Sequence, residues 1–241
     1  MKKYELVKED SVEINGVTLY RIKALVDIGN TIKINDLGGY VESESNLSHD
    51  ENCWISGNAC VYEDAYVYGD ASVHGDAYVF GNACIYGNAH VSGNTCVYEN
   101  ARVSENACVS GNACVSGNAC VSGNAHISGN ACVSGNAHVY GNACVSGNAH
   151  ISGNAWVYEN ALIKLSVDIQ VYSNVGSENG TLTAYRTKNG VELTRGCFKG
   201  TLEEFRSAVI KKHGTDSKIG VNYLGICNLI AHWFDLPDQI K

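Results

Sequence analysis

The chain has 241 residues, a formal net charge of −8 at pH 7, 26 glycines and a single proline. An acidic chain lacks the basic surface that phosphate contacts require, so a general nucleic-acid-binding function is not expected. The N-terminal residues MKKYELVKED contain no apolar run. Because no stretch reaches the length of a membrane span either, we expect neither a secretory signal nor a membrane partner, and we expect a cytoplasmic protein. The 11 cysteines should then be free thiols or metal ligands.

Residues 1–40 are predicted to form an N-terminal β cap. Short strands are expected at residues 4–7 and 12–14, and the Asn15-Gly16 pair favours a hairpin turn into a strand at residues 17–24. A stack of parallel strands has an open edge at each end, and open edges promote aggregation. An element that covers the first strands is therefore expected in this region.

Residues 41–175 are predicted to form the central domain, because they contain an uninterrupted six-residue repeat with the consensus Val-Ser-Gly-Asn-Ala-x. Every position reached by steps of six from Ile55 to Ile163 is Val or Ile, and the position two residues earlier is Ala except at Cys53 and Thr95. Side chains of a strand alternate between its faces, so Ala and Val point the same way and suit the inside of a narrow tube. A period of six with a Gly-Asn pair excludes a helix. The repeat therefore predicts a parallel β-solenoid.

The corners of this solenoid should lie at the Gly-Asn pair. The site two residues after each Val is usually Gly, and the next site is Asn or Asp throughout residues 58–160. Asn and Asp tolerate a positive φ better than other non-glycine residues. We therefore predict the left-handed backbone conformation at the Asn/Asp site, and only a need for a small or flexible residue at the Gly site. Four glutamates occupy that second site: Glu63, Glu99, Glu105 and Glu159.

The Val/Ile-x-x-x-Ala-x hexad resembles the hexapeptide-repeat family, whose members form left-handed parallel β-helices with three hexads per triangular coil. The resemblance implies a mainly-β fold, a left-handed parallel β-helix of about six coils. Residues 36–48, DLGGYVESESNLS, resemble the start of YdcK-type proteins, a group of proposed transferases and related phage or prophage proteins. Residues 183–190 and 197–205 resemble segments of phage-associated proteins.

Residues 176–241 are predicted to form a small α+β cap. A hairpin is expected from residues 181–187 and 191–198 around the turn at Asn189-Gly190. Thr201-Leu-Glu-Glu204 is a capping box, so a helix should begin there, run to about Lys212 and stop at Gly214. A second helix is expected at residues 218–233. The cap should stabilise the solenoid end, and docking of a partner is the alternative.

Outward side chains 18 residues apart should stack in columns about 4.8 Å apart along the solenoid. In one column, cysteine and histidine alternate and suggest a zinc or copper site. Four residues in a straight column span about 14 Å, whereas a tetrahedral zinc ion needs all four ligands within about 2.0–2.3 Å. We therefore expect cysteine to be a small apolar filler, no cofactor, and substoichiometric metal in the purified protein. The alternative metal ligands are His90, Cys108, His126 and Cys144.

Aromatic residues gather at outward positions of the first coils, with a smaller group at Tyr140, Trp156 and Tyr158. Aromatic side chains are enriched at interfaces, so the first group is the predicted binding surface. The alternative is that these residues satisfy β-propensity alone. The predicted binding residues are Tyr62, Tyr66, Tyr68, Tyr78, Phe80, Tyr86 and Tyr98.

Three classes of function follow from these features. We expect a non-catalytic binding or scaffold protein, acting on a host protein or ligand if phage-encoded, with anti-defence inhibition as one hypothesis. The alternative implied by the resemblance is an acyltransferase that works as a trimer with an acyl-CoA-type donor, with His90 and His126 as catalytic candidates. However, the repeat has no inserted loop that would give a general base a cleft. A structural virion component is the third class. A homodimer or homotrimer is expected.

Overall fold

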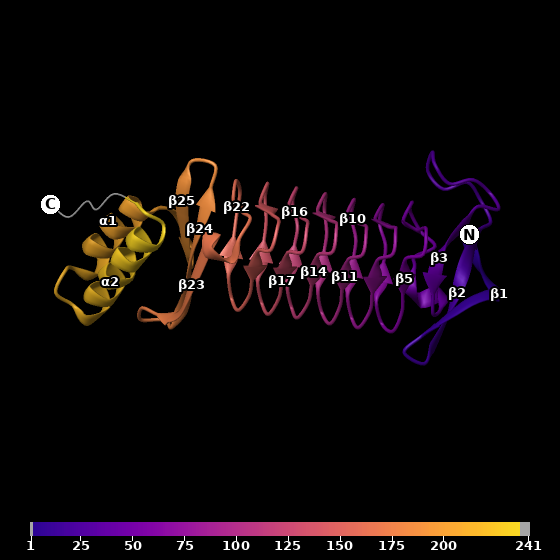
Figure 1. Cartoon of the computed structure of the whole chain (residues 1–241), viewed down its shortest axis with the longest axis horizontal. Helices are drawn as coiled ribbons and strands as arrows, with labels where there is room; N and C mark the ends of the chain where they lie inside the picture. The colour runs from indigo at the N-terminus through magenta and orange to yellow at the C-terminus, as the bar shows by residue number, and fades with distance from the viewer. Residues whose placement is uncertain (1, 237–241) are drawn as a thin grey trace.

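The computed structural model describes residues 2–236 and shows a rod with a different module at each end (Figure 1). The outermost residues of the two predicted end domains, residue 1 and residues 237–241, lie outside this description. The middle of the rod is a parallel β-solenoid, as the repeat predicts, and it has about seven turns where about six were expected. The first turn begins at β3 (Leu37–Val41), which pairs in parallel with β5 (Cys60–Val61), the second strand of the repeat.

Three parallel sheets form the faces of the solenoid, and each turn contributes one two-residue strand to each face. The first face holds β5 (Cys60–Val61), β8 (Tyr78–Val79), β11 (Cys96–Val97), β14 (Cys114–Val115), β17 (Cys132–Val133) and β20 (His150–Ile151). The second holds β6 (Tyr66–Val67), β9 (Cys84–Ile85), β12 (Arg102–Val103), β15 (Cys120–Val121), β18 (His138–Val139) and β21 (Trp156–Val157). The third holds β4 (Trp54–Ile55), β7 (Ser72–Val73), β10 (His90–Val91), β13 (Cys108–Val109), β16 (His126–Ile127), β19 (Cys144–Val145) and β22 (Leu162–Ile163).

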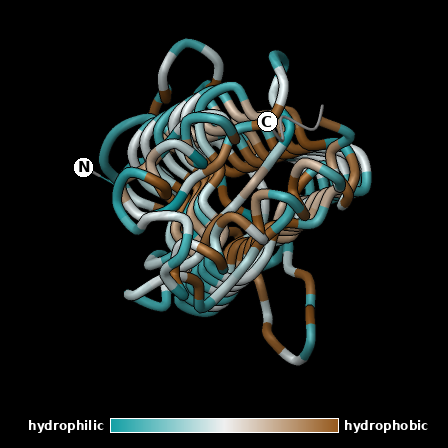
Figure 2. Tube along the Cα trace, turned by 90° about the vertical axis from the view of Figure 1, so that its left-hand side faces the viewer, coloured by the Kyte–Doolittle hydropathy of each residue, from teal (hydrophilic) through white to brown (hydrophobic). Residues whose placement is uncertain are grey.

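The interior of the solenoid is made of the two inward positions of the hexad. The Val and Ile side chains are fully buried, and the Ala side chains are at most 2% exposed. Coils stack in register when viewed along the rod (Figure 2), and backbone N–H groups donate to carbonyls one turn later, as from Trp54 to Ala71 at 3.0 Å. Thr95, in the Ala column, is buried with no partner for its hydroxyl among the described residues. A small and a β-branched side chain therefore fill the tube, as predicted.

The prediction for the corners was wrong. Positive φ lies at the Gly site, as at Gly117 (+71°), and not at the Asn/Asp site. Glutamate at this site shares the left-handed conformation, with φ of 59° at both Glu99 and Glu105. Each of these carboxylates accepts the backbone N–H of a glycine one turn later, at 2.6 Å and 2.7 Å. A charge-assisted hydrogen bond thus offsets the strain of an L-residue at positive φ.

The Asn site has a different role from the one we assigned. Side-chain amides of successive turns donate to one another in a ladder along the corner, as from Asn94 Nδ2 to Asn112 Oδ1 at 3.1 Å. The backbone N–H at the same site also bonds to the next turn, as from Asn94 to the Gly111 carbonyl at 2.8 Å. Asn is therefore selected by side-chain hydrogen bonding between turns and not by its tolerance of positive φ.

The N-terminal module extends one face of the solenoid. β1 (Tyr4–Ile14) is a single strand with an irregularity between Val7 and Ser11, where two short strands were predicted. It pairs antiparallel with β2 (Val17–Ala24), which pairs antiparallel with β3. The 3-10 turn η1 (Glu44–Asn46) then leads into the repeat. The hairpin therefore covers the edge of the first parallel sheet, as expected.

Lys3 closes the inside of the first turn. Its side chain is buried, and its ammonium donates to the carbonyls of Asp50, Glu51 and Cys53 at 3.2, 3.3 and 3.0 Å. Tyr4 beside it donates from its hydroxyl to the Leu47 carbonyl at 2.8 Å. These bonds satisfy backbone carbonyls that would otherwise be orphaned in the irregular chain before the repeat.

The C-terminal module closes the other end. After η2 (Ser166–Asp168), an antiparallel sheet forms from β23 (Ile169–Val175), β24 (Gly180–Thr187), β25 (Gly190–Arg195) and β26 (Phe198–Thr201). Ile169 and Tyr185 of this sheet pack into the solenoid core. Two helices cover its outer side, α1 (Leu202–His213) and α2 (Lys218–Trp233), and they share a second core with it (Figure 1). The predicted hairpin, both helices and the capping box at Thr201 are confirmed.

Candidate binding sites

Stacked aromatic rings run along two corners of the first coils. On one corner, Tyr68 stacks on Tyr86 one turn later, with centroids 5.0 Å apart and planes 2° apart, and Tyr66 stacks on Tyr68 at 5.0 Å. On the other, Phe80 stacks on Tyr98 at 5.0 Å and 4°. Tyr68, Tyr86, Phe80 and Tyr98 occupy the hexad position that is Ser in the consensus. Residues 18 apart therefore meet because the register of the coils brings them together.

Two of the seven predicted binding residues differ in exposure from the half-buried rings of these stacks. Tyr62 is 3% exposed, because the N-terminal hairpin packs over it through Leu19, and burial raises the pKa of Tyr62 to about 12. It stacks on Phe80 from beneath the hairpin, at 5.2 Å. Tyr78 is 37% exposed and stands between cysteines on the flat first face. A partner would therefore reach Tyr78 directly but Tyr62 only if the hairpin moved.

A second aromatic cluster lies at the far end of the solenoid. Tyr140 stacks on Tyr158 at 5.6 Å, and His138 lies 4.4 Å from Trp156. The Tyr140 hydroxyl and His138 Nδ1 are 2.8 Å apart, and burial lowers the pKa of His138. The C-terminal sheet binds the backbone of Trp156 from both sides through threonine hydroxyls. This cluster therefore joins the solenoid to its C-terminal module.

The candidate metal ligands lie in one column, as predicted, at paired positions of successive strands on the third face. Among the described residues, no group of three or more His, Cys, Asp or Glu side chains could share a metal ion. All 11 cysteines are free thiols. In the first column, burial raises the pKa of Cys96 and Cys132, with a smaller contribution from Cys114. Protonated thiols on a flat strand surface suit the role of apolar filler.

The two candidate catalytic histidines are exposed on the same flat face. His90 Nδ1 lies 2.5 Å from the hydroxyl of Ser72, one turn earlier, and His126 lies two turns later between two cysteines. The Ser72–His90 pair has the composition of a nucleophile and its base, but the described chain places no third group to orient the imidazole. Both histidines project from parallel strands and not from a loop.

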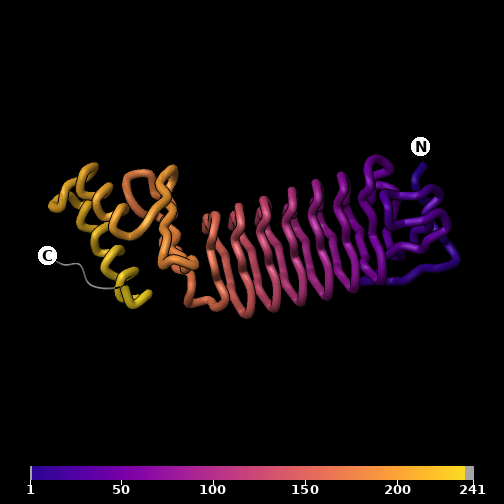
Figure 3. Tube along the Cα trace, turned by 90° about the horizontal axis from the view of Figure 1, so that it is seen from above, coloured from indigo at the N-terminus to yellow at the C-terminus, as the bar shows by residue number. Residues whose placement is uncertain are grey.

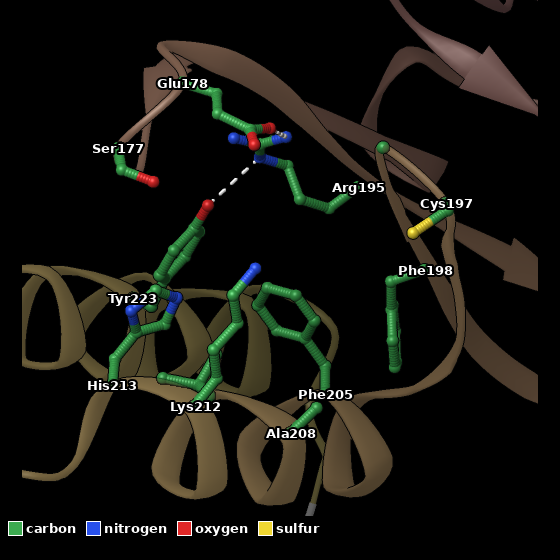
Figure 4. Close-up of a pocket in the computed structure, with 12 residues that line it drawn as sticks. Ser177, Glu178, Arg195, Cys197, Phe198, Phe205, Ala208, Lys212, His213 and Tyr223 are labelled. Atoms are coloured by element: carbon green, nitrogen blue, oxygen red, sulfur yellow. Dashed lines mark hydrogen bonds and ion pairs between the residues drawn. The ribbon is translucent and has the colours of Figure 1, made fainter.

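Sequence reasoning missed a cavity of about 300 Å³ in the C-terminal module (Figure 4). It lies between the end of β25, the turn before β26, and the two helices. Arg195 and Tyr223 line one side, with the Arg195 Nε donating to the Tyr223 hydroxyl at 3.0 Å. Lys212 and His213 of α1 line another, and aromatic rings form the wall between them. The cavity brings positive charge and apolar surface together.

Only a short part of the chain matches a known family. The model of the YdcK beta solenoid repeat matches residues 125–141, within the most regular part of the repeat. No curated protein matches the chain. Within residues 2–236, no helix has the length and apolar character to cross a membrane. The match and the structure agree on a β-solenoid. The aromatic rings of the first coils and the C-terminal cavity lie outside the matched segment, whereas His126 and the pair His138 and Tyr140 lie within it.

Proposed function

We propose that the protein is a non-catalytic binding protein that presents an aromatic stripe, Tyr66, Tyr68 and Tyr86, to a protein partner. The observation that carries the proposal is the stacking of these rings, which fixes them before a partner arrives. Tyrosine supplies a large contact area with few rotatable bonds, so little conformational entropy is lost on binding. All three side chains are half-buried, so part of each remains accessible to a partner.

The scaffold under the stripe favours the same function. Each coil is bonded to the next through backbone groups, as from Tyr68 N–H to the Ile85 carbonyl at 3.0 Å. A solenoid built in this way offers an extended and rigid surface. The inward residues are fixed by packing, whereas outward positions vary without disturbing the core. The rings of Tyr68 and Tyr86 occupy positions that are Ser in the consensus. The solenoid therefore does not need these rings for its own structure.

For the partner, we propose a protein of a bacterial host cytoplasm, with inhibition of a host defence protein by a phage-encoded chain as the specific form. The resemblance of residues 183–190 and 197–205 to phage-associated segments supports this proposal. The net charge of −8 favours a protein partner over nucleic acid.

The test removes the stripe and keeps the scaffold. The double variant Tyr68→Ser/Tyr86→Ser restores the consensus residue at both positions, and Tyr140→Ser/Tyr158→Ser makes the same changes in the same column near the other end. Tagged proteins would capture partners from host lysate, with quantitative mass spectrometry as the readout and circular dichroism as the check on folding. We expect a partner retained by wild type and by the Tyr140/Tyr158 variant but lost from the Tyr68/Tyr86 variant. Equal capture by all three would refute the proposal.

We also propose that the chain self-associates as a dimer or trimer through the half of the solenoid lined by Ser and Cys. Small side chains on a flat parallel face allow close contact between two copies. Native mass spectrometry and light scattering would measure the assembly. A monomer at micromolar concentration would refute this part of the proposal and leave the aromatic stripe untouched.

A further inference from the structure

The cavity in the C-terminal module has the composition of a ligand site independent of the aromatic stripe. We propose that it binds a small organic carboxylate with an apolar ring or chain. The carboxylate would face Arg195 and Lys212, and the apolar part would lie on Phe198 and Phe205. This arrangement is visible in Figure 4, where charged and aromatic side chains converge on one space.

Arg195 is the anchor of the proposed site. Its side chain is only 12% exposed. Nε donates to the Tyr223 hydroxyl at 3.0 Å, and Nη2 donates to the Val175 carbonyl at 2.9 Å. Its one acidic neighbour among the described residues is Glu178, whose carboxylate lies 3.9 Å from Nη1 and is 79% exposed. A carboxylate so distant and so well solvated compensates little of the cost of burying a guanidinium.

Nη1 of Arg195 therefore has an incomplete partner. A ligand carboxylate at hydrogen-bonding distance from Nη1 would form a charge-assisted bond, and Glu178 is free to turn into solvent. The Tyr223 hydroxyl, which accepts from Nε, keeps its own proton to donate. Two donors on one side of the cavity can thus bind the two oxygens of one carboxylate.

A second positive charge enters from the last turn of α1. The Lys212 side chain extends from the helix into the cavity, towards Arg195 (Figure 4). Lys212 makes no ion pair with any residue in the described chain. The helix dipole explains why cations gather at this end of α1, but it does not explain a buried arginine on the opposite wall. The two cations together favour an anion between them.

The apolar wall decides in favour of an organic acid over an inorganic anion. The rings of Phe198 and Phe205 lie 5.0 Å apart at 60°, and Val209 continues the surface along α1. A phosphate or sulfate ion would leave this surface in contact with water. A cavity of about 300 Å³ is at the lower end of the range of small-molecule sites. The fitting ligand is therefore a compact acid with one ring or a short chain.

Two glycines, Gly176 in the loop after β23 and Gly180 at the start of β24, lie against this site. A Cβ at Gly180 would lie 2.5 Å from Arg195 Nη1, and a Cβ at Gly176 would clash with the Tyr223 hydroxyl. Gly176 also has a positive φ of 73°. The loop therefore leaves room for the Arg195–Tyr223 pair, and a methyl group at Gly180 would push the guanidinium out of position.

The test uses the full chain and three probes: 3-phenylpropionate, its neutral amide 3-phenylpropionamide, and acetate. Isothermal titration calorimetry and ligand-observed NMR would report binding. We expect 3-phenylpropionate to bind at least about tenfold more tightly than either other probe, because only it combines charge with an apolar body. Equal binding of the acid and the amide, or no binding of the acid, would overturn the proposal.

Matched variants localise the effect. Lys212→Gln should weaken binding of 3-phenylpropionate by about tenfold, whereas Lys211→Gln, one residue away and outside the cavity, should leave it unchanged. The acid should also slow alkylation of Cys197, whose thiol is exposed at the cavity, as followed by peptide-resolved mass spectrometry. Equal effects of the two lysine variants, or unchanged alkylation, would refute this location. A peptide ending in phenylalanine, compared with the free acid, would show whether the natural source is a peptide terminus or a small molecule.

Discussion

A methyl group at Gly117 tests the packing between coils directly. Gly117 has φ of +71°, a conformation that costs an L-residue about 1–2 kcal/mol. A Cβ there would lie 2.7 Å from the carbonyl oxygen and 2.8 Å from the nitrogen of Gly135, one turn later. These distances are well inside contact distance, and Asn118 N–H donates to that carbonyl at 2.7 Å, so the coils cannot separate freely. Overpacking adds about 1–3 kcal/mol, and Gly117→Ala should therefore cost about 2–5 kcal/mol.

Gly153 provides the matched control for this substitution. It occupies the same hexad position with φ of +69°, but a Cβ there meets nothing within 4 Å in the described part of the chain. Gly153→Ala should therefore cost only the conformational part, about 1–2 kcal/mol. Urea unfolding followed by circular dichroism measures both variants against wild type. Equal losses would refute the contact between coils, and a neutral Gly117→Ala would refute positive φ at the Gly site.

Three further predictions concern stability. Burial raises the pKa of both Cys60 and Cys227 to about 11 from 9.0, so each thiol stabilises the fold fully below pH 9 and loses that contribution as pH rises to 11. Urea titrations from pH 8 to 11 should show a decline that Cys60→Ala reduces. Glu105→Ala should cost about 1 kcal/mol, because the bond to the Gly123 N–H is lost while φ stays positive, whereas Glu105→Gly should be nearly neutral in the same assay. Lys3→Met should cost about 1–3 kcal/mol and speed hydrogen exchange in the first turn, because three carbonyls lose their donor.

The solenoid could be predicted because its determinants repeat. A period of two within each strand and of 18 between coils places every Val inside and every outward column in register, and the strand pairs reproduce those columns, as from His90 to Cys108. The corners could not be predicted in the same way. The presence of Glu105 at the Gly site argued against a positive φ there, because an L-residue is strained in that conformation. The hydrogen bond that offsets this strain comes from Gly123, one turn later, and cannot be inferred from the local sequence. Local propensity therefore assigned the left-handed conformation to Asn and not to Gly in the Gly-Asn pair.

The C-terminal cavity could not be predicted, because no local motif connects its parts. Arg195 and Tyr223 are 28 residues apart and come from a strand and a helix. An arginine and a tyrosine at this spacing do not indicate a binding site in the sequence. The available signal was the pair of glycines at positions 176 and 180, which read as ordinary turn residues. Only the fold shows that their missing side chains make room for the guanidinium and the phenol.

The two proposed sites differ in their effect on the stability of the fold. In the solenoid, the inward positions carry the stability, so aromatic rings replace outward Ser without altering the core. The C-terminal module has a separate core, and its cavity retains a poorly paired Arg195, which makes that site less stable without a ligand. The rigid rod between them keeps one small ligand from contacting both (Figure 3). Their substitutions should therefore be additive: Tyr68→Ser/Tyr86→Ser should not alter binding of 3-phenylpropionate, and Lys212→Gln should not alter partner capture. Coupling between the two would mean that the solenoid transmits strain along its axis and is not a passive spacer.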